Sequence, residues 1–157
     1  MAQGLMTSHQ RTIIRSSISS LRGEIDERRG RIRIEEEELD TLRAQRSKIN
    51  WIFNKTSFRN FTTSVEWWFP QIRFDDFGGN NRCRFTGKLE EMQEAINKQR
   101  AVHANNIEII DKRITELENS IRDMQSSNSS ANSTIINLLS EWQNGNAGMQ
   151  FPNSPIT

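Results

Sequence analysis

A heptad repeat of isoleucine and leucine constrains this chain more than any other feature. One row consists of Ile18, Ile25, Ile32 and Leu39. A companion row runs through Ile14, Leu21, Arg28, Glu35, Leu42 and Ile49, with a charged pair at its centre. The steps between the two rows alternate between three and four residues, which is the pattern of a helix packed as a coiled coil. We therefore predict a helix over about residues 10–50.

A second apolar stripe follows, and it predicts a second helix over about residues 80–125. Its members are Phe85, Leu89, Met92, Ile96, Gln99, His103, Ile107, Ile110, Ile114, Leu117, Ile121 and Met124. Two successive steps of four at His103 interrupt the heptad as a stutter. Only 34% of the chain is hydrophobic, and its 21 basic and 20 acidic residues nearly cancel. This composition suits thin helices that bury one stripe, so we expect an all-α antiparallel two-helix coiled-coil hairpin.

The polar interruptions of the two stripes predict a register. If facing residue numbers sum to about 135, Arg28 and Glu35 come close to Gln99 and His103. Polar side chains in an apolar seam cost stability but select one alignment. We predict that these four residues form one register-setting layer.

The connection between the stripes, residues 51–84, is rich in aromatic residues. Ten of the twelve aromatic residues lie between Trp51 and Phe85. Either these rings bury one another in a compact head, or they form an exposed patch that binds a partner, and we favour the patch. The candidate partner-binding residues are Trp51, Phe58, Phe61, Trp67, Trp68, Phe69, Phe77 and Gly79. Residues 71–85 form either a small β-hairpin or a turn into the second helix, and the turn is preferred.

The C-terminal region, residues 126–157, changes composition. Residues 126–133 are serine, asparagine and alanine, which predicts a flexible linker. The apolar stretch that follows, residues 134–142, is short enough to dock as a helical turn. We expect the residues beyond 145 to be disordered without a partner.

The residues that support catalysis or cofactor binding are missing from the sequence. It has no phosphate-binding loop, no nucleophile elbow and no metal-ligand spacing, so we expect neither an enzyme nor a cofactor or metal site. Cys83 is the only cysteine, which favours a reducing, cytoplasmic location. We expect no classical signal peptide and no membrane span. The balanced charge makes nucleic acid an unfavoured partner.

One segment resembles a known family. The stretch Phe77-Gly78-Gly79-Asn80-Asn81-Arg82-Cys83-Arg84-Phe85 resembles the Trp-x-Gly turn of the WXG-type helical-hairpin proteins of type VII secretion, with Phe77 in place of the tryptophan. The spacing from Ile114 to Ile121 is similar to that in the small helical partners of toxins with the Leu-x-Gly domain. The chain departs from the family in its long connection, and it has no tyrosine for the family's export signal.

The resemblance implies a partner or targeting chaperone that binds the helical N-terminal region of a toxin, with possible export alongside it. From the residues alone we predict a non-enzymatic protein–protein interaction module. The alternative is a structural assembly subunit, such as a viral, phage or injection-machine component, that self-associates through its coiled coil.

Overall fold

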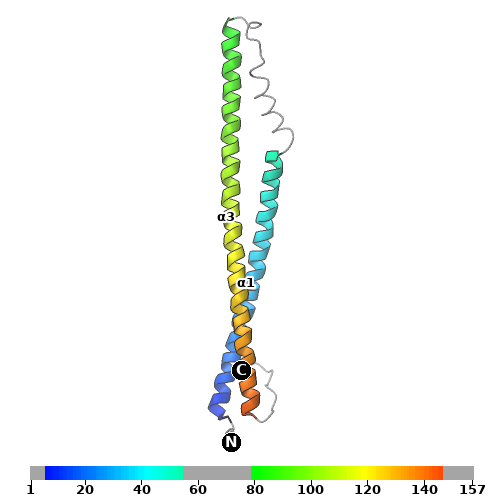
Figure 1. Cartoon of the computed structure of the whole chain (residues 1–157), viewed down its shortest axis with the longest axis vertical. Coiled ribbons are helices and arrows are strands. Elements are labelled where there is room, and N and C mark those ends of the chain that lie inside the picture. Colours follow the sequence, from blue (N-terminus) through cyan, green and yellow to red (C-terminus); the bar gives the residue numbers. More distant parts are fainter. Residues whose placement is uncertain (1–5, 55–78, 147–157) are drawn as a thin grey trace. The chain divides into compact units, whose positions relative to one another are not determined.

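The computed structural model describes residues 6–54 and 79–146 of the 157-residue chain. These residues form two helices, α1 (Ser8–Asn54) and α3 (Gly79–Gly145), and no strand occurs among them (Figure 1). The chain divides into two compact units. The first unit comprises Met1–Glu38 and Leu117–Thr157, and the second comprises Leu39–Glu116. In each unit, α1 packs antiparallel to α3, which confirms the predicted all-α helical hairpin.

A capping box begins α1 directly before Ser8. The backbone N–H of Gln10 donates to Oγ1 of Thr7 at 3.2 Å, and the backbone N–H of Thr7 donates to Oε1 of Gln10 at 2.9 Å. This reciprocal pair satisfies two amide groups that have no partner within the helix. The local sequence therefore fixes where α1 starts.

The heptad of α1 is confirmed by burial. The seam of α1 consists of buried or half-buried side chains at alternating steps of three and four: Arg11, Ile14, Ile18, Leu21, Ile25, Arg28, Ile32, Glu35, Leu39, Leu42, Arg46 and Ile49. Arg28 and Glu35 occupy the seam positions that the repeat assigned to them. The pattern predicted this face correctly because one apolar stripe is what a helix buries against one neighbour.

The core of the first unit comes from both helices. Its buried members are Ile14, Ile18 and Ile25 of α1, and Ala131, Ile135 and Trp142 of α3. Met6, Leu21, Leu138 and Leu139 pack against this cluster. The segment after residue 125 is therefore part of the folded hairpin.

The predicted linker at residues 126–133 is wrong, because α3 continues without a break to Gly145. The seam positions explain why. Asn128 and Ala131 keep the three-and-four spacing between Met124 and Ile135, and Ala131 is buried. Serine and asparagine fall mainly on the exposed positions around them, so tertiary packing outweighs their low helix propensity.

The C-terminal end of α3 is closed by contacts with the start of the chain. The side-chain amide of Asn146, which is buried, donates to the carbonyl oxygen of Trp142 at 2.8 Å. The backbone N–H of Met6 donates to the carbonyl oxygen of Gly145 at 3.0 Å. Both bonds satisfy carbonyl groups in the last turn that lack a partner within the helix.

The stutter predicted at His103 is also wrong. The seam of α3 is an unbroken heptad from Leu89, made of buried or half-buried side chains: Leu89, Gln93, Ile96, Arg100, His103, Ile107, Ile110, Ile114, Leu117, Ile121, Met124, Asn128, Ala131, Ile135, Leu138 and Trp142. Met92 and Gln99, which the predicted stripe included, are exposed. Gln93 and Arg100 take their places, because long polar side chains can pack an aliphatic stem on a seam while the head reaches water.

The observed register differs from the predicted one by three heptads. In the first unit, Arg28 lies opposite Asn128, and their numbers sum to 156. In the second unit, Arg46 lies opposite Asp111, and their numbers sum to 157. The predicted sum of about 135 is about 21 smaller than the observed sums. Because 21 is a multiple of seven, both alignments place the same apolar rows of the two helices against each other.

The start of α3 decides between the two interpretations of residues 71–85. Gly79 begins the helix, so a β-strand over residues 82–85 is wrong and the helical alternative is confirmed for Gly79 onward. The remaining part of the aromatic connection, residues 55–78, lies outside the described residues.

Candidate interaction surface

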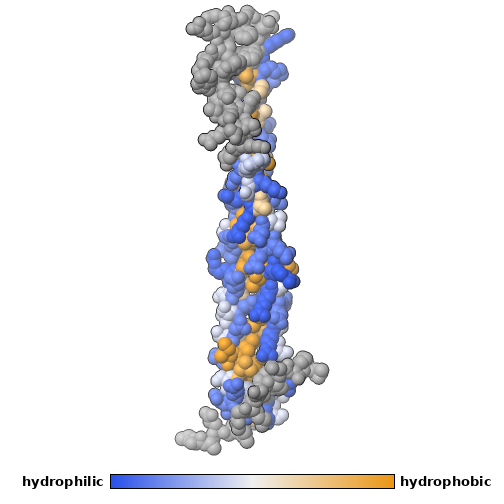
Figure 2. All heavy atoms as spheres, turned by 90° about the vertical axis from the view of Figure 1, so that its right-hand side faces the viewer, coloured by the Kyte–Doolittle hydropathy of each residue, from blue (hydrophilic) through white to orange (hydrophobic). Residues whose placement is uncertain are grey.

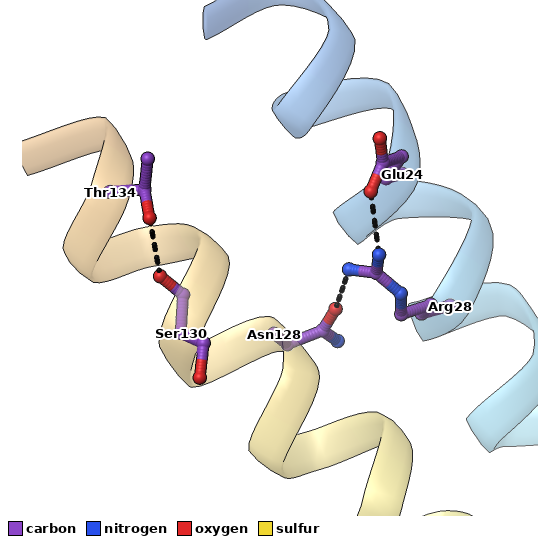
Figure 3. A network of polar contacts seen from close by, with 5 residues as sticks. All are labelled: Glu24, Arg28, Asn128, Ser130 and Thr134. Atoms are coloured by element: carbon purple, nitrogen blue, oxygen red, sulfur yellow. Dashed lines mark hydrogen bonds and ion pairs between the residues drawn. The ribbon is translucent and has the colours of Figure 1, made fainter. Parts of the chain in front are cut away.

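The predicted polar layer does not form as one cluster. In the first unit, Nη1 of Arg28 donates to Oδ1 of Asn128 at 3.3 Å, and Nη2 donates to Oε2 of Glu24 at 2.6 Å (Figure 3). In the second unit, Gln99 and His103 hydrogen-bond to each other at 3.2 Å. The register prediction was therefore correct in giving Arg28 a polar partner across the seam and wrong about which residue it is.

Glu35, the other charged residue in the seam of α1, has a local partner. Nη2 of Arg31 lies 4.0 Å from Oε1 of Glu35, one helical turn away. The second carboxylate oxygen, Oε2, is buried and accepts no hydrogen bond from the described residues. Glu35 is therefore held by its own helix.

A cross-helix ion pair joins Arg46 to Asp111 in the second unit. Nη2 of Arg46 donates to Oδ2 of Asp111 at 3.1 Å, and Nε donates to the other carboxylate oxygen, so the contact is bidentate. This hydrogen bonding lowers the pKa of the Asp111 carboxyl below its ordinary value, although partial desolvation opposes the shift. The same contact raises the pKa of Arg46. A bidentate guanidinium–carboxylate pair has a fixed geometry and so contributes to register.

An exposed apolar row lies on α3 in the second unit. Ala95, Val102 and Ile109 follow each other at intervals of seven residues, and Met92 lies three residues before Ala95. The polar Gln99 and Asn106 lie between them, and all six are exposed. Val102 is 49% exposed and Ile109 is 59% exposed. We call Met92, Ala95, Val102 and Ile109 the α3 row. Each of its members directly precedes a seam residue and lies about 100° around the helix from it, on a side of α3 that α1 does not cover.

The sequence prediction missed the α3 row, although its signal is present. The predicted stripe included Met92 but left out Val102 and Ile109, each of which directly precedes a residue of that stripe. Counting heptad positions separately would have assigned them to a second row. Figure 2 shows that apolar side chains gather in separate patches between hydrophilic ones on the face it views.

Most of the predicted aromatic site cannot be placed. Phe58, Phe61, Trp67, Trp68, Phe69 and Phe77 lie outside the described residues, and Gly79 is the first residue of α3. Trp51, on the last turn of α1, is 60% exposed. The aromatic patch stays a prediction.

The first unit also contains an open groove. It has a volume of about 570 Å³ and is lined by Met6, Gln10, Asn137, Ser140, Glu141, Asn144 and Gly145. Glu141 is the one ionisable side chain in this lining, so the groove offers hydrogen-bonding groups without a titratable pair for acid–base chemistry. Over residues 6–54 and 79–146, no three His, Cys, Asp or Glu side chains are placed to share a metal ion.

Neither described helix has a segment apolar enough to cross a membrane. Comparison with protein-family models, with curated proteins and with solved structures gave no match to this chain.

Proposed function

We propose that this chain is a non-enzymatic interaction module that binds a helix of another protein through the α3 row. The observation that carries the proposal is the exposure of Val102 and Ile109, two aliphatic side chains one heptad apart on a helix that already packs through a neighbouring seam. A helix with apolar side chains at heptad spacing would cover this row as the third member of a bundle.

The seam next to the α3 row supports the same proposal. In the second unit, His103, Ile107, Ile110 and Ile114 are only half-buried, although they occupy seam positions. Two helices alone leave the edge of their common seam in contact with water. A third helix on the α3 row would remove further apolar surface from water, which provides about 25 cal/mol per Å² of driving force.

A finer proposal follows from the sequence resemblance. The chain would serve as a partner or targeting chaperone for a toxin secreted by a type VII system, and the bound helix would belong to the toxin's N-terminal region. The resemblance over residues 77–85 and 114–121 supports this assignment. The aromatic residues that follow Trp51 would then contribute further anchoring side chains.

A structural assembly subunit is the second candidate function. It is favoured by a different observation, the exposed Ile34 on α1, which lies between a basic and an acidic segment of the same helix. A surface with both signs of charge around an apolar centre can pair with a copy of itself.

The test compares a double variant with a single control variant on the same helix. Val102→Glu with Ile109→Glu places charges on the α3 row, whereas Ile136→Glu places a charge at an equally exposed aliphatic residue of the first unit. Each tagged protein is used for affinity capture from native extract and for co-expression with candidate helical proteins. Loss of one specific partner only in the Val102/Ile109 variant, with unchanged helicity by circular dichroism, supports the proposal. Equal capture by both variants refutes it.

A further inference from the structure

The exposed side of α1 in the first unit has a feature that the hairpin does not explain. Ile34 is 64% exposed, and Gly30, Arg31, Glu37 and Glu38 lie within one turn of it on either side. Residues three and four apart share a helix face, so these five form one surface, which we call the Ile34 face. It is distinct from the seam of α1, which points to α3.

No neighbour among the described residues accounts for a glycine at position 30. A Cβ atom built at this position meets nothing within 4 Å, so no neighbouring group requires the absence of a side chain. A glycine in the middle of a helix is less stable than an alanine. The missing side chain does, however, leave room for another helix, or for a long side chain of that helix, to approach the backbone closely.

The charges around Ile34 are arranged with opposite signs on its two sides. Arg28, Arg29, Arg31 and Arg33 precede it, and Glu35, Glu36, Glu37 and Glu38 follow it. If two copies of α1 cross in opposite directions at Ile34, Arg31 of each copy faces Glu37 of the other. Glu38 of each copy then lies opposite Gly30 of the other, where no side chain occupies the space. In a parallel alignment Arg31 would face Arg31 and Glu37 would face Glu37. Like charges repel at this distance, so only the antiparallel alignment is complementary.

We propose that the Ile34 face binds a second copy of this chain, forming a two-fold symmetric antiparallel dimer with Ile34 on the axis. The two Ile34 side chains bury each other, and two Arg31–Glu37 ion pairs flank them. The interface is isologous, so every contact occurs twice. A single helix crossing buries less than the standard interface area, and we expect a dissociation constant in roughly the micromolar range.

Charge exchange tests the proposed alignment. Arg31→Glu alone and Glu37→Arg alone each replace two attractive contacts with two repulsive ones, and each should weaken the dimer by roughly tenfold. The double exchange Arg31→Glu with Glu37→Arg restores complementarity and should return the dissociation constant to within about threefold of the original. Sedimentation velocity over a concentration series measures all four proteins. Because the pairs are exposed, dimerisation should also weaken with added salt.

Two further variants keep the result interpretable. Ile34→Ala should weaken the dimer, whereas Ile136→Ala, at an aliphatic residue that is 65% exposed, should not. Circular dichroism confirms that each variant keeps its helices. The double variant of the α3 row should dimerise normally, so failure of this proposal and failure of the proposed function are separable.

Thiol cross-linking tests the direction of the pairing in a Cys83→Ser background. A mixture of Arg31→Cys and Glu37→Cys proteins should give the mixed cross-link with a short bifunctional reagent. Predominant cross-linking of Arg31→Cys to itself indicates a parallel dimer and overturns the proposal. A chain that stays monomeric at all concentrations, or a double exchange that fails to rescue the single ones, overturns it as well.

Discussion

Replacing Trp142 by alanine tests whether the end of α3 belongs to the core. Trp142 is 7% exposed and packs in the cluster that joins Ile14, Ile18 and Ile25 to α3. A buried tryptophan removes about 150–250 Å² from water, equivalent to roughly 4–6 kcal/mol at about 25 cal/mol per Å². Measured truncations of large aromatic residues cost about 3–5 kcal/mol, and we expect Trp142→Ala to fall in that range.

The matched control is Ile136→Ala on the same helix, where the side chain is 65% exposed. Most of its surface stays in water, and alanine has the higher helix propensity, so its effect should stay within about 0.5 kcal/mol. Thermal unfolding followed by circular dichroism should show a Tm roughly 6–20 °C lower for Trp142→Ala and nearly unchanged for Ile136→Ala. Equal Tm values for the two variants would show that residues 126–145 do not pack as described.

Three other changes test separate contacts. Asp111→Asn removes the carboxylate of the cross-helix ion pair. Because the pKa of Asp111 is lowered in the folded state, the pair stabilises the protein above pH 3.8, and this stabilisation is lost as the pH falls further. The difference in Tm between wild type and Asp111→Asn should therefore shrink on acidification. Thr7→Ala removes the N-terminal cap of α1 and should cost about 1 kcal/mol in urea unfolding. In a background without the native cysteine, the pair Ile25→Cys and Ala131→Cys should form an intramolecular disulfide. The control pair Ile25→Cys and Met124→Cys, which is displaced by one heptad, should not. The opposite result would contradict the observed register.

The sequence predicted the helices and their packing faces well, because these depend on local periodicity. The seam of α1 was predicted from Ile14 to Ile49, including Arg28 and Glu35, but the prediction omitted the seam residues Arg11 and Arg46. The extent of α3 was not, because the composition of residues 126–133 suggested a linker. In a long helix, one buried Ala131 in phase with Ile135 matters more than the serines on the exposed side.

The interaction surfaces were harder to predict for a related reason. The α3 row and Ile34 are apolar residues that lie outside the seams of their helices. Periodicity shows that a face exists, but it does not show which face an internal neighbour covers. Only the packing of α1 on α3 shows that Val102, Ile109 and Ile34 remain exposed.

Register is the property that periodicity leaves open, and polar residues decide it. Sliding one helix by any multiple of seven residues keeps all apolar rows facing each other. The alignment with a sum of about 135 would place Arg28 opposite Ile107 instead of Asn128. The observed alignment gives it the amide oxygen of Asn128. Because Glu24 on the same helix pairs with Arg28 in either alignment, the observed register gains the hydrogen bond to Asn128, and a hydrogen bond to a charged group contributes about 1.5–3 kcal/mol. The apolar contacts are equivalent in both alignments, so a few polar positions decide between them.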